Sequence, residues 1–449
     1  MKEISNEMAT EPMKKLAFRI SIPMVLSMIS IALYGIIDTM FIAQISNDAL
    51  TASALSIPIQ SIITAIALGL GIGLNSFLAK TLGEKNEEKS KAIIKNGLTL
   101  TLLSWFFVAL ICFFGTDSFL SFFTEKPDIL NQGKEYLIIV GTISIGTFYQ
   151  ILFEKILEAY GKAKSSMLVQ VSGAIINLIL DPILIFGYFG LPALGIRGAA
   201  ISTVIGQCTG MIIGIVILVK LHIINFIDLF KLKIEKDICS EIYKVGFPTT
   251  IREAVSSFIT LILNKILAGF SEDAIAVWGV YSQLQKFVII IVYGFNYGMI
   301  PILAYNYGAK NKNRIKECIN IFIRIGIVVT LIGEIVFLIF TNQLINIYDN
   351  SGALLYIAVP ALRILSIGFV FAGVSLVISA VFQAFGNGIY SLIVNLSRQV
   401  VITLPLILLF KKFIGLNGVW TAFTVSEIIT MIIAIYLYRK YKRELKLEI

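Results

Sequence analysis

The sequence predicts an all-α polytopic membrane protein with twelve transmembrane helices, arranged as two six-helix lobes related by an internal repeat. Three observations predict this fold class. The 449 residues are 57% hydrophobic and only 14% charged, against about 25% charged residues in an ordinary soluble domain. Apolar stretches of membrane-spanning length recur along the chain, and the second half repeats the first. This composition excludes a secreted module, a disordered regulator and a soluble two-domain enzyme.

Each apolar stretch is long enough, at about 20 residues, to cross about 30 Å of hydrocarbon. A polar linker over 221–243 separates a six-helix lobe at 1–220 from a second lobe at 244–449. The predicted spans are 17–45, 50–80, 92–116, 133–158, 164–189, 195–220, 244–269, 274–306, 317–341, 354–382, 388–411 and 415–438. The start of the chain lacks a small-residue cleavage site after a short apolar stretch, so we expect no cleaved signal peptide.

Successive connections between these spans lie on alternate sides of the membrane, and lysine and arginine are concentrated on one of the two sides. The side with both termini and the linker carries 26 of these residues, whereas the other side carries five. We therefore expect a multi-pass protein of the cytoplasmic (inner) membrane, with both termini and the linker in the cytoplasm. The net charge of +9 lies in these short tracts and not along one stripe, so we expect a lipid bilayer and no nucleic acid as partner.

An internal repeat relates the two halves. Residues 23–93 align with 248–318 at a constant offset of 225 without a gap, and 16 of the 71 pairs are identical. The identical pairs include Pro23 and Pro248, Asp48 and Asp273, Gly83 and Gly308, and Asn86 and Asn311. Because each half has an even number of spans, the copies share one orientation, which predicts an axis along the membrane normal and a central cavity between the halves.

Polar residues inside apolar spans are costly, and we treat them first as functional candidates. The first span carries Asp38, with Tyr34 one turn earlier on the same face. The fifth span carries Asn177 and Asp181, which are four residues apart and stack on one face. Pro182 frees a backbone carbonyl and disfavours helical geometry at Asp181. Such oxygens suit Na⁺ or a proton and argue against zinc or copper. The alternative is that each acid is interfacial or half of an internal salt bridge.

Other charges in the spans have a simpler interpretation. Glu154, Lys155 and Glu158 lie at spacings at which ordinary intrahelical ion pairs form. We expect about half of the second-lobe charges to pair with one another. These are Arg252, Glu253, Lys265, Lys286, Glu334, Arg363, Arg398 and Glu427. The single histidine, His222, lies in the linker, so we expect no histidine proton relay.

Four segments carry a resemblance to a known family. IDTMFIAQ (37–44), INLILDPILIFG (176–187), LGIRGAAIST (194–203) and GFNYGMIPILAYNYGAKN (294–311) resemble the multidrug and toxic compound extrusion (MATE) family, especially its MepA-like bacterial branch. The similarity covers roughly residues 15–440. It implies a V-shaped pair of lobes and an antiporter that exports amphipathic, mostly cationic organic compounds or drugs by alternating access, coupled to H⁺ or Na⁺.

The same resemblance implies the site residues. Asp38 corresponds to the family's first-helix acid, Asn177 and Asp181 to its fifth-helix amide and acid, and Thr203 to its sixth-helix hydroxyl. We expect these four residues to form the cation- or proton-coupling site, with Asp38, Asn177 and Asp181 as the Na⁺ ligands if Na⁺ couples. Like-charge repulsion favours protonation of one acid, which weakly favours H⁺. We expect no catalytic residue, no cofactor beyond the coupling ion, and a monomer.

Four residues are candidates for the substrate cavity: Tyr34, Tyr149, Glu253 and Tyr281. A carboxylate attracts a cationic compound, and aromatic faces add cation–π contacts of about 1–2 kcal/mol. The alternative for the aromatic residues is helix packing. Glu253 lies nearer to the proline than the seventh-helix acid of the NorM-like branch does, and the tenth span carries Arg363 where an acid would be expected. These departures leave open whether the second lobe takes part in coupling.

Two other function classes compete with an exporter. A lipid-linked oligosaccharide flippase of the same wider superfamily moves a polyanionic head group, so Arg and Lys should line its cavity. A polytopic membrane enzyme needs a catalytic cluster at a membrane edge, such as His with Asp or Ser. The early acids fit the flippase poorly, and the single linker histidine fits the enzyme worst.

Overall fold

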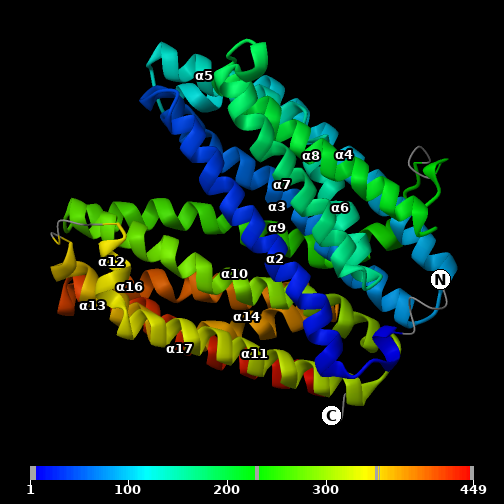
Figure 1. The fold of residues 1–449 in the computed structure, drawn as a ribbon. Coiled ribbons are helices and arrows are strands. Elements are labelled where there is room, and N and C mark those ends of the chain that lie inside the picture. The colour runs from blue at the N-terminus through cyan, green and yellow to red at the C-terminus, as the bar shows by residue number, and fades with distance from the viewer. Residues whose placement is uncertain (1–6, 228–231, 349–351, 353, 445–449) are drawn as a thin grey trace.

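The computed structural model describes residues 7–227, 232–348, 352 and 354–444, which form helices with no strand among them. The elements are α2 (Met13–Ala43), α3 (Asn47–Gly83), α4 (Glu87–Ser121), α5 (Pro127–Thr142), α6 (Ile145–Ala159), α7 (Ala163–Phe186), η1 (Tyr188–Gly190), α8 (Ile196–Lys220), α9 (Lys236–Ala268), α10 (Glu272–Gly308), α11 (Lys312–Ile339), α12 (Thr341–Asn346), α13 (Leu355–Ser366), α14 (Phe369–Ala384), α15 (Gly388–Leu396), η3 (Ser397–Val401), α16 (Thr403–Ile414) and α17 (Leu416–Glu444). Figure 1 shows two helical lobes that meet near the chain termini and spread apart at the end that carries α5 and α13. The molecule therefore has the V shape that the resemblance implied.

The described residues contain the twelve spans that the sequence predicts. Nine helices are long and apolar enough to cross a membrane, where α15, η3 and α16 count together as one helix over 388–414. Two bent helix pairs raise the number to eleven. The twelfth is α9, a helix of 33 residues that carries Arg252 and Glu253 in its middle. α9 begins at Lys236, inside the stretch predicted as linker. Asp237 in its first turn favours this early start, because an acid there complements the helix dipole.

The fourth and tenth spans are broken, a feature that the predicted ranges 133–158 and 354–382 did not specify. α5 and α6 meet at 42°, and α13 and α14 meet at 46°. The first break contains no proline. Its Ser144 hydroxyl donates to the Gly141 carbonyl at 2.7 Å, a local bond that competes with the helical ladder. The breaks fall at Ile143 and Gly368, which are 225 positions apart, so the two lobes share this feature.

The internal repeat is visible in the backbone. Ser46 and Ser271 cap α3 and α10 in the same extended conformation, and Asn86 and Asn311 cap α4 and α11. Positive φ angles also recur at equivalent places. The pairs are Lys85 and Lys310 at 59° and 55°, Gly161 and Gly386 at 72° and 81°, and Gly195 and Gly415 at 54° and 64°. The local geometry of the two copies therefore confirms the repeat.

The lobes meet through repeat-related contacts. α3 packs against α9, and the equivalent helix α10 packs against α2. A Cβ atom built on Gly83 would lie 2.0 Å from the Tyr305 carbonyl oxygen, and one built on Gly308 would lie 1.9 Å from the Lys80 carbonyl oxygen. Gly308 is the repeat equivalent of Gly83, and Lys80 is the repeat equivalent of Tyr305, so the two contacts are equivalent with the lobes exchanged. The interface is thus pseudo-twofold, and only glycine permits its close backbone approach.

Two short segments also tie each lobe to the other; we call them the straps. The first strap is 7–11 before α2. Arg314 of α11 donates to the carbonyls of Met8 at 2.9 Å and Glu11 at 3.0 Å. The second strap is 232–235 before α9, and its Lys233 amide donates to the Thr99 hydroxyl of α4 at 2.9 Å. Met8 and Lys233 are 225 positions apart, so the straps follow the repeat.

Candidate functional site

A polar centre lies inside the first lobe, where α2, α7 and α8 meet. The Asn177 amide nitrogen of α7 lies 3.3 Å from Asp181 Oδ1, and 3.4 Å from the hydroxyl oxygens of Ser202 and Thr203 on α8. The Ser202 hydroxyl donates to the same Asp181 oxygen. All four side chains are buried. The structure therefore brings three of the predicted coupling residues together, although they come from distant parts of the chain.

Asp38 of α2 completes this centre. Its carboxyl group lies close enough to Asp181 for the two acids to interact electrostatically, and Tyr34, one turn earlier, lies beside Asp38 and Thr203. Asp38 Oδ1, Asn177 Oδ1 and Asp181 Oδ2 are buried and find no hydrogen-bond partner among the described residues. Neither acid forms an ion pair with a Lys, Arg or His in the part of the chain that the structure describes. The two acids and the amide thus each have one buried oxygen without a hydrogen-bond partner in the described structure.

The chemistry of this oxygen set fits a proton or Na⁺. Carboxylate, amide and hydroxyl oxygens are hard ligands, and two neighbouring carboxylates without a cation favour binding of a positive charge between them. One expectation about the local backbone was wrong. α7 stays α-helical through Asp181 and Pro182 as far as Phe186. Proline is tolerated inside membrane spans because packed neighbours and local adjustments satisfy the freed backbone groups.

Sequence reasoning missed two neighbours of this centre. Ser202 precedes Thr203 in the same segment, but its hydroxyl is the one that donates to Asp181. Tyr136 of α5 interacts electrostatically with Asp38 and lies next to Gln60 of α3. Nothing in the sequence near Tyr136 shows which face of α5 approaches α2. Ser202 had a signal, because it is a second hydroxyl beside the residue that the resemblance identified.

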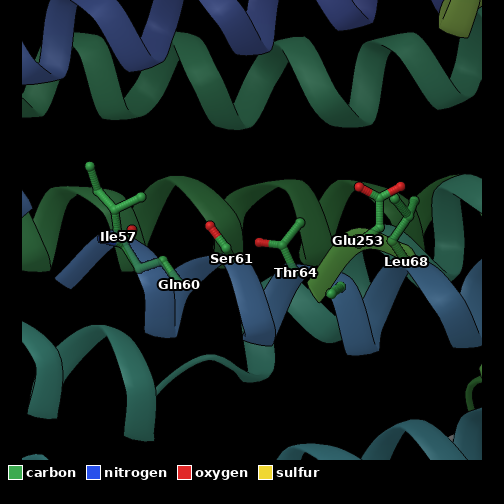
Figure 2. Close-up of a pocket in the computed structure, with 7 residues that line it drawn as sticks. Ile57, Gln60, Ser61, Thr64, Leu68 and Glu253 are labelled. Carbon is green, nitrogen blue, oxygen red and sulfur yellow. The ribbon is translucent and has the colours of Figure 1, made fainter. Parts of the chain in front are cut away.

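A pocket lies between the lobes. It has a volume of about 330 Å³. Its lining consists of Ile57, Gln60, Ser61, Thr64, Ala65 and Leu68 of α3 and Glu253 of α9 (Figure 2). Gln60 therefore contacts both this pocket and Tyr136 of the polar centre. Glu253, the predicted acidic cavity residue, is the charged member of the described lining.

The predicted aromatic cavity residues lie in different environments. Tyr34 belongs to the polar centre. Tyr149 is buried in the first lobe, where its hydroxyl donates to the Leu98 carbonyl at 3.1 Å. Tyr281 is buried in the second lobe, with its ring centroid 5.4 Å from that of Trp278. In this structure Tyr149 and Tyr281 therefore pack inside the lobes, and their contact with a substrate stays a prediction.

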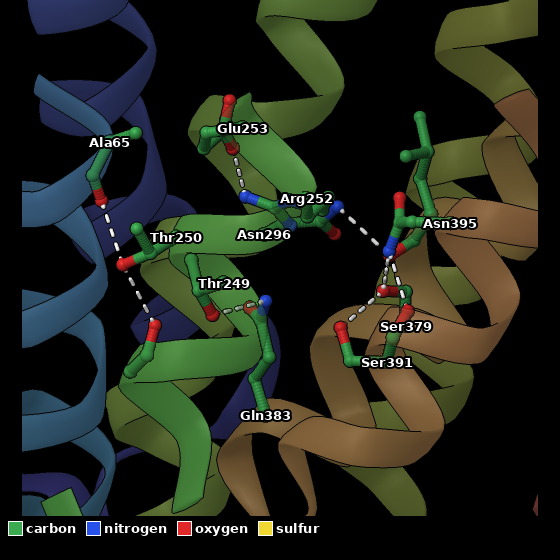
Figure 3. Close-up of polar contacts among 12 residues, drawn as sticks. Ala65, Thr249, Thr250, Arg252, Glu253, Asn296, Ser379, Gln383, Ser391 and Asn395 are labelled. Atoms are coloured by element: carbon green, nitrogen blue, oxygen red, sulfur yellow. Dashed lines mark hydrogen bonds and ion pairs between the residues drawn. The ribbon is translucent and has the colours of Figure 1, made fainter. Parts of the chain in front are cut away.

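Acids of the second lobe pair with arginines. Arg398 donates to Glu427 at 2.7 Å. Arg252 donates to Glu253 (Figure 3). Arg252 also lies over the Tyr293 ring, 5.9 Å from its centroid. These pairs confirm the expectation that part of the second-lobe charges pair with one another. In the first lobe, Lys155 and Glu158 form the expected ion pair at 2.8 Å.

Twelve spans in two repeat-related lobes, with a pocket between the lobes and a polar centre inside the first lobe, define a membrane transporter. The MatE family model matches residues 23–183 and 248–409, which is most of the chain and one match for each copy of the repeat. The chain belongs to the MatE family. The two matched ranges correspond to the two lobes, so the family model reproduces the internal repeat found in the sequence.

Curated relatives and solved structures agree with this assignment. The multidrug export protein MepA of Staphylococcus saprophyticus is 26% identical over 93% of this chain and 92% of its own length. MepA of Staphylococcus aureus strain MRSA252 is 26% identical over 95% of this chain and 94% of its own. A crystal structure of a MATE protein in complex with MaL6 superposes with a TM-score of 0.90 at 24% identity, over 98% of both chains. The structural match shows that the fold is shared.

Proposed function

We propose that this protein exports amphipathic, mostly cationic organic compounds by antiport against a proton or Na⁺, through alternating access. The observation that carries the proposal is the acid pair of the first lobe, where Asp38 and Asp181 lie close enough to interact electrostatically and each has one buried oxygen without a hydrogen-bond partner. Each acid lacks a basic partner among the described residues, so a bound cation offsets the cost of two carboxylates inside the membrane. The curated MepA relatives, which are multidrug export proteins, support the substrate class.

The proposed orientation places both termini and the linker in the cytoplasm. The 26 basic residues on the terminal side against five on the other support it. In this orientation, the lobes touch at the cytoplasmic end and spread apart toward the outside (Figure 1). The structure then corresponds to an outward-open state of an inner-membrane protein. A Ser240→Cys variant tests the orientation, because exposed residue 240 should react with an impermeant thiol reagent only after the cells are opened.

α2 is the proposed connection between ion binding and lobe movement. One end of this helix carries Asp38. Toward its other end, Val25 and Ser21 contact Gly294 and Gly298 of α10 in the opposite lobe. Pro23 lies within this contacting part of the helix and removes one backbone hydrogen bond, so α2 bends more easily there. Neutralisation of the acid pair by an entering cation would change the bend of α2 and the packing between the lobes.

We propose H⁺ as the coupling ion and Na⁺ as its competitor for the same oxygens. A proton needs only one carboxylate, whereas Na⁺ needs several ligands, of which Asp38, Asn177, Asp181 and Thr203 supply candidates. The test is drug uptake into inverted vesicles at a fixed membrane potential, with each ion gradient imposed separately. We expect a pH gradient to drive uptake. Uptake that follows only the Na⁺ gradient would replace H⁺ by Na⁺, and uptake indifferent to both would refute the proposal.

A further inference from the structure

The pocket between the lobes offers hydrogen-bonding groups in place of aromatic faces. Its polar lining consists of the Glu253 carboxylate, the Gln60 amide and the hydroxyls of Ser61 and Thr64. Figure 2 shows the polar ends of Ser61, Thr64 and Glu253 on one side of the helices. The rest of the described lining is aliphatic or small: Ile57, Ala65 and Leu68. This lining can accept hydrogen bonds from a ligand, and it supplies no ring for a cation–π contact.

Arg252 controls the charge of this lining from outside the pocket. Its guanidinium donates to one carboxylate oxygen of Glu253 and lies over the Tyr293 ring, while the residue is only 6% exposed. The Nε atom of Arg252 is buried without a hydrogen-bond partner in the described structure. The Arg252 guanidinium therefore partly neutralises Glu253, and Arg252 itself does not line the pocket. A bound compound meets a weakened negative charge next to neutral acceptors.

Cations differ in what they need from such a lining. A quaternary ammonium has no N–H group and is recognised best by aromatic faces. A protonated amine or an amidine donates charge-assisted hydrogen bonds, which are shorter and about twice as strong as neutral ones. The carboxylate, amide and hydroxyl oxygens around Glu253 can accept these bonds. The composition of the pocket therefore distinguishes among cationic compounds by their hydrogen-bond donors as well as by their charge.

We infer that the pocket prefers compounds whose cationic group is a hydrogen-bond donor, such as a protonated amine or an amidine, and that Arg252 limits how tightly Glu253 holds them. The inference rests on the proposed function, since it names the substrate class of the pocket between the exporting lobes. Partial neutralisation of Glu253 also suits a transporter, because a compound held by a full negative charge would leave more slowly.

The experiment uses a matched pair of probes: a fluorescent tertiary amine that is protonated at the assay pH, and its N-methyl quaternary derivative. Equilibrium binding of both is measured on the purified full-length protein. We expect the wild type to bind the tertiary amine about tenfold more tightly, the effect of one hydrogen bond to a charged group. Glu253→Gln should weaken binding of the tertiary amine and bring the two probes to similar affinity.

Arg252→Gln gives the change of opposite sign. It leaves Glu253 without its partner and should tighten binding of both cations by about tenfold. Arg252→Lys keeps a positive charge at the position and should stay close to the wild type. A purely structural role for Arg252 predicts weaker binding in both arginine variants. If Arg252→Gln does not fold, as judged by thermal unfolding, the Arg252→Lys and Glu253→Gln variants still decide the question.

Two results would overturn the inference: equal affinity of the wild type for the two probes, or equal weakening by Glu253→Gln and Arg252→Gln. Ion-driven uptake of the same probes distinguishes failure of this inference from failure of the proposed function. Uptake without any preference between the probes refutes the inference and leaves the function intact. A binding preference without ion-driven uptake refutes the function alone.

Discussion

The two lobes share one fold and one repeat, but the acids inside their spans differ in whether they have a basic partner. In the first lobe, Asp38 and Asp181 lie close enough to interact electrostatically, and neither has a basic partner in the described structure. In the second lobe, Glu427 is paired with Arg398 at 2.7 Å. An unpaired acid pair gains from capturing a cation, whereas a paired acid has already been neutralised by its own lobe. The comparison therefore supports a coupling site in the first lobe only.

The difference arises at few positions. The repeat partner of Asp38 is Leu263, a fully buried member of the second-lobe core. On the other side of that lobe, the π-turn η3 carries Arg398 to Glu427 of α17. Such turns insert one residue into a helix and often mark functional or specialised positions. The leucine at the position of Asp38 and the π-turn thus distinguish the second lobe, with its Arg398–Glu427 pair, from the polar centre of the first.

The largest expected effect is on transport. Asp38→Asn should abolish ion-driven uptake, a loss of about a hundredfold, because the amide keeps the shape of the side chain but no longer binds a cation. Asp181→Asn should do the same. Uptake into inverted vesicles under an imposed gradient measures the loss at matched protein levels.

Asp273→Asn is the matched control for this prediction. Asp273 is an exposed acid in the first turn of α10, where water solvates it. We expect its removal to leave uptake nearly unchanged. Equal damage from Asp38→Asn and Asp273→Asn would show that the first-lobe acid has no special role and would remove the contrast between the lobes.

The second prediction separates the lobes by stability. Glu427→Gln leaves Arg398 buried without its partner and should destabilise the fold by about 3 kcal/mol. Asp181→Asn breaks no ion pair and should cost less than about 1 kcal/mol. Thermal unfolding in detergent compares the two variants. A double variant with Met at both 398 and 427 should recover most of the stability, and a similar cost for Glu427→Gln and Asp181→Asn would contradict the assignment of the pairs.

Much of the fold could be predicted from the sequence because its signals are repeated or strongly apolar. Spans, sidedness of charge and the repeat each depend on many residues. Asp38, Asn177, Asp181 and Thr203 could be selected because polar groups in apolar spans are rare and their segments resemble a family. The breaks within spans four and ten were not predictable, since the local bond at Ser144 leaves no strong sequence signal.

The remaining parts of the site depend on side-chain directions that spacing does not determine. Adjacent residues on a helix do not normally face each other, so the Arg252–Glu253 pair was not expected from their order. It forms because the guanidinium lies over Tyr293 of α10 and reaches back to the carboxylate. Tyr136 likewise acquires its position beside Asp38 from the packing of α5, which no single-helix pattern shows.

The third prediction tests the pseudo-twofold contact. Gly83→Ala and Gly308→Ala should each destabilise the closed end of the V by about 2 kcal/mol, because each new Cβ atom would meet a carbonyl oxygen of the other lobe. Distances between spin labels on the two lobes should shift toward separation at that end. Gly35→Ala is the control, since nothing lies within 4 Å of its Cβ position. If only one of the two glycine substitutions destabilised the closed end, the two equivalent contacts would contribute unequally to its stability.

The smallest expected effect distinguishes the two straps. Arg314 donates three hydrogen bonds around the first strap, to Met8, Glu11 and Asn306, whereas the Thr99 hydroxyl accepts one from Lys233 in the second. Arg314→Gln should therefore cost about 1–2 kcal/mol and Thr99→Val about 0.5–1 kcal/mol. Thermal unfolding gives the totals, and hydrogen exchange of the backbone amides in each strap shows where the loss occurs. Equal losses would contradict this ranking, whereas no measurable loss in Thr99→Val would mean that the second strap is held mainly by its other bond, from the Glu235 amide to Asn96 at 2.6 Å. Faster exchange confined to the strap that was altered would show that the straps act independently, although the repeat relates them.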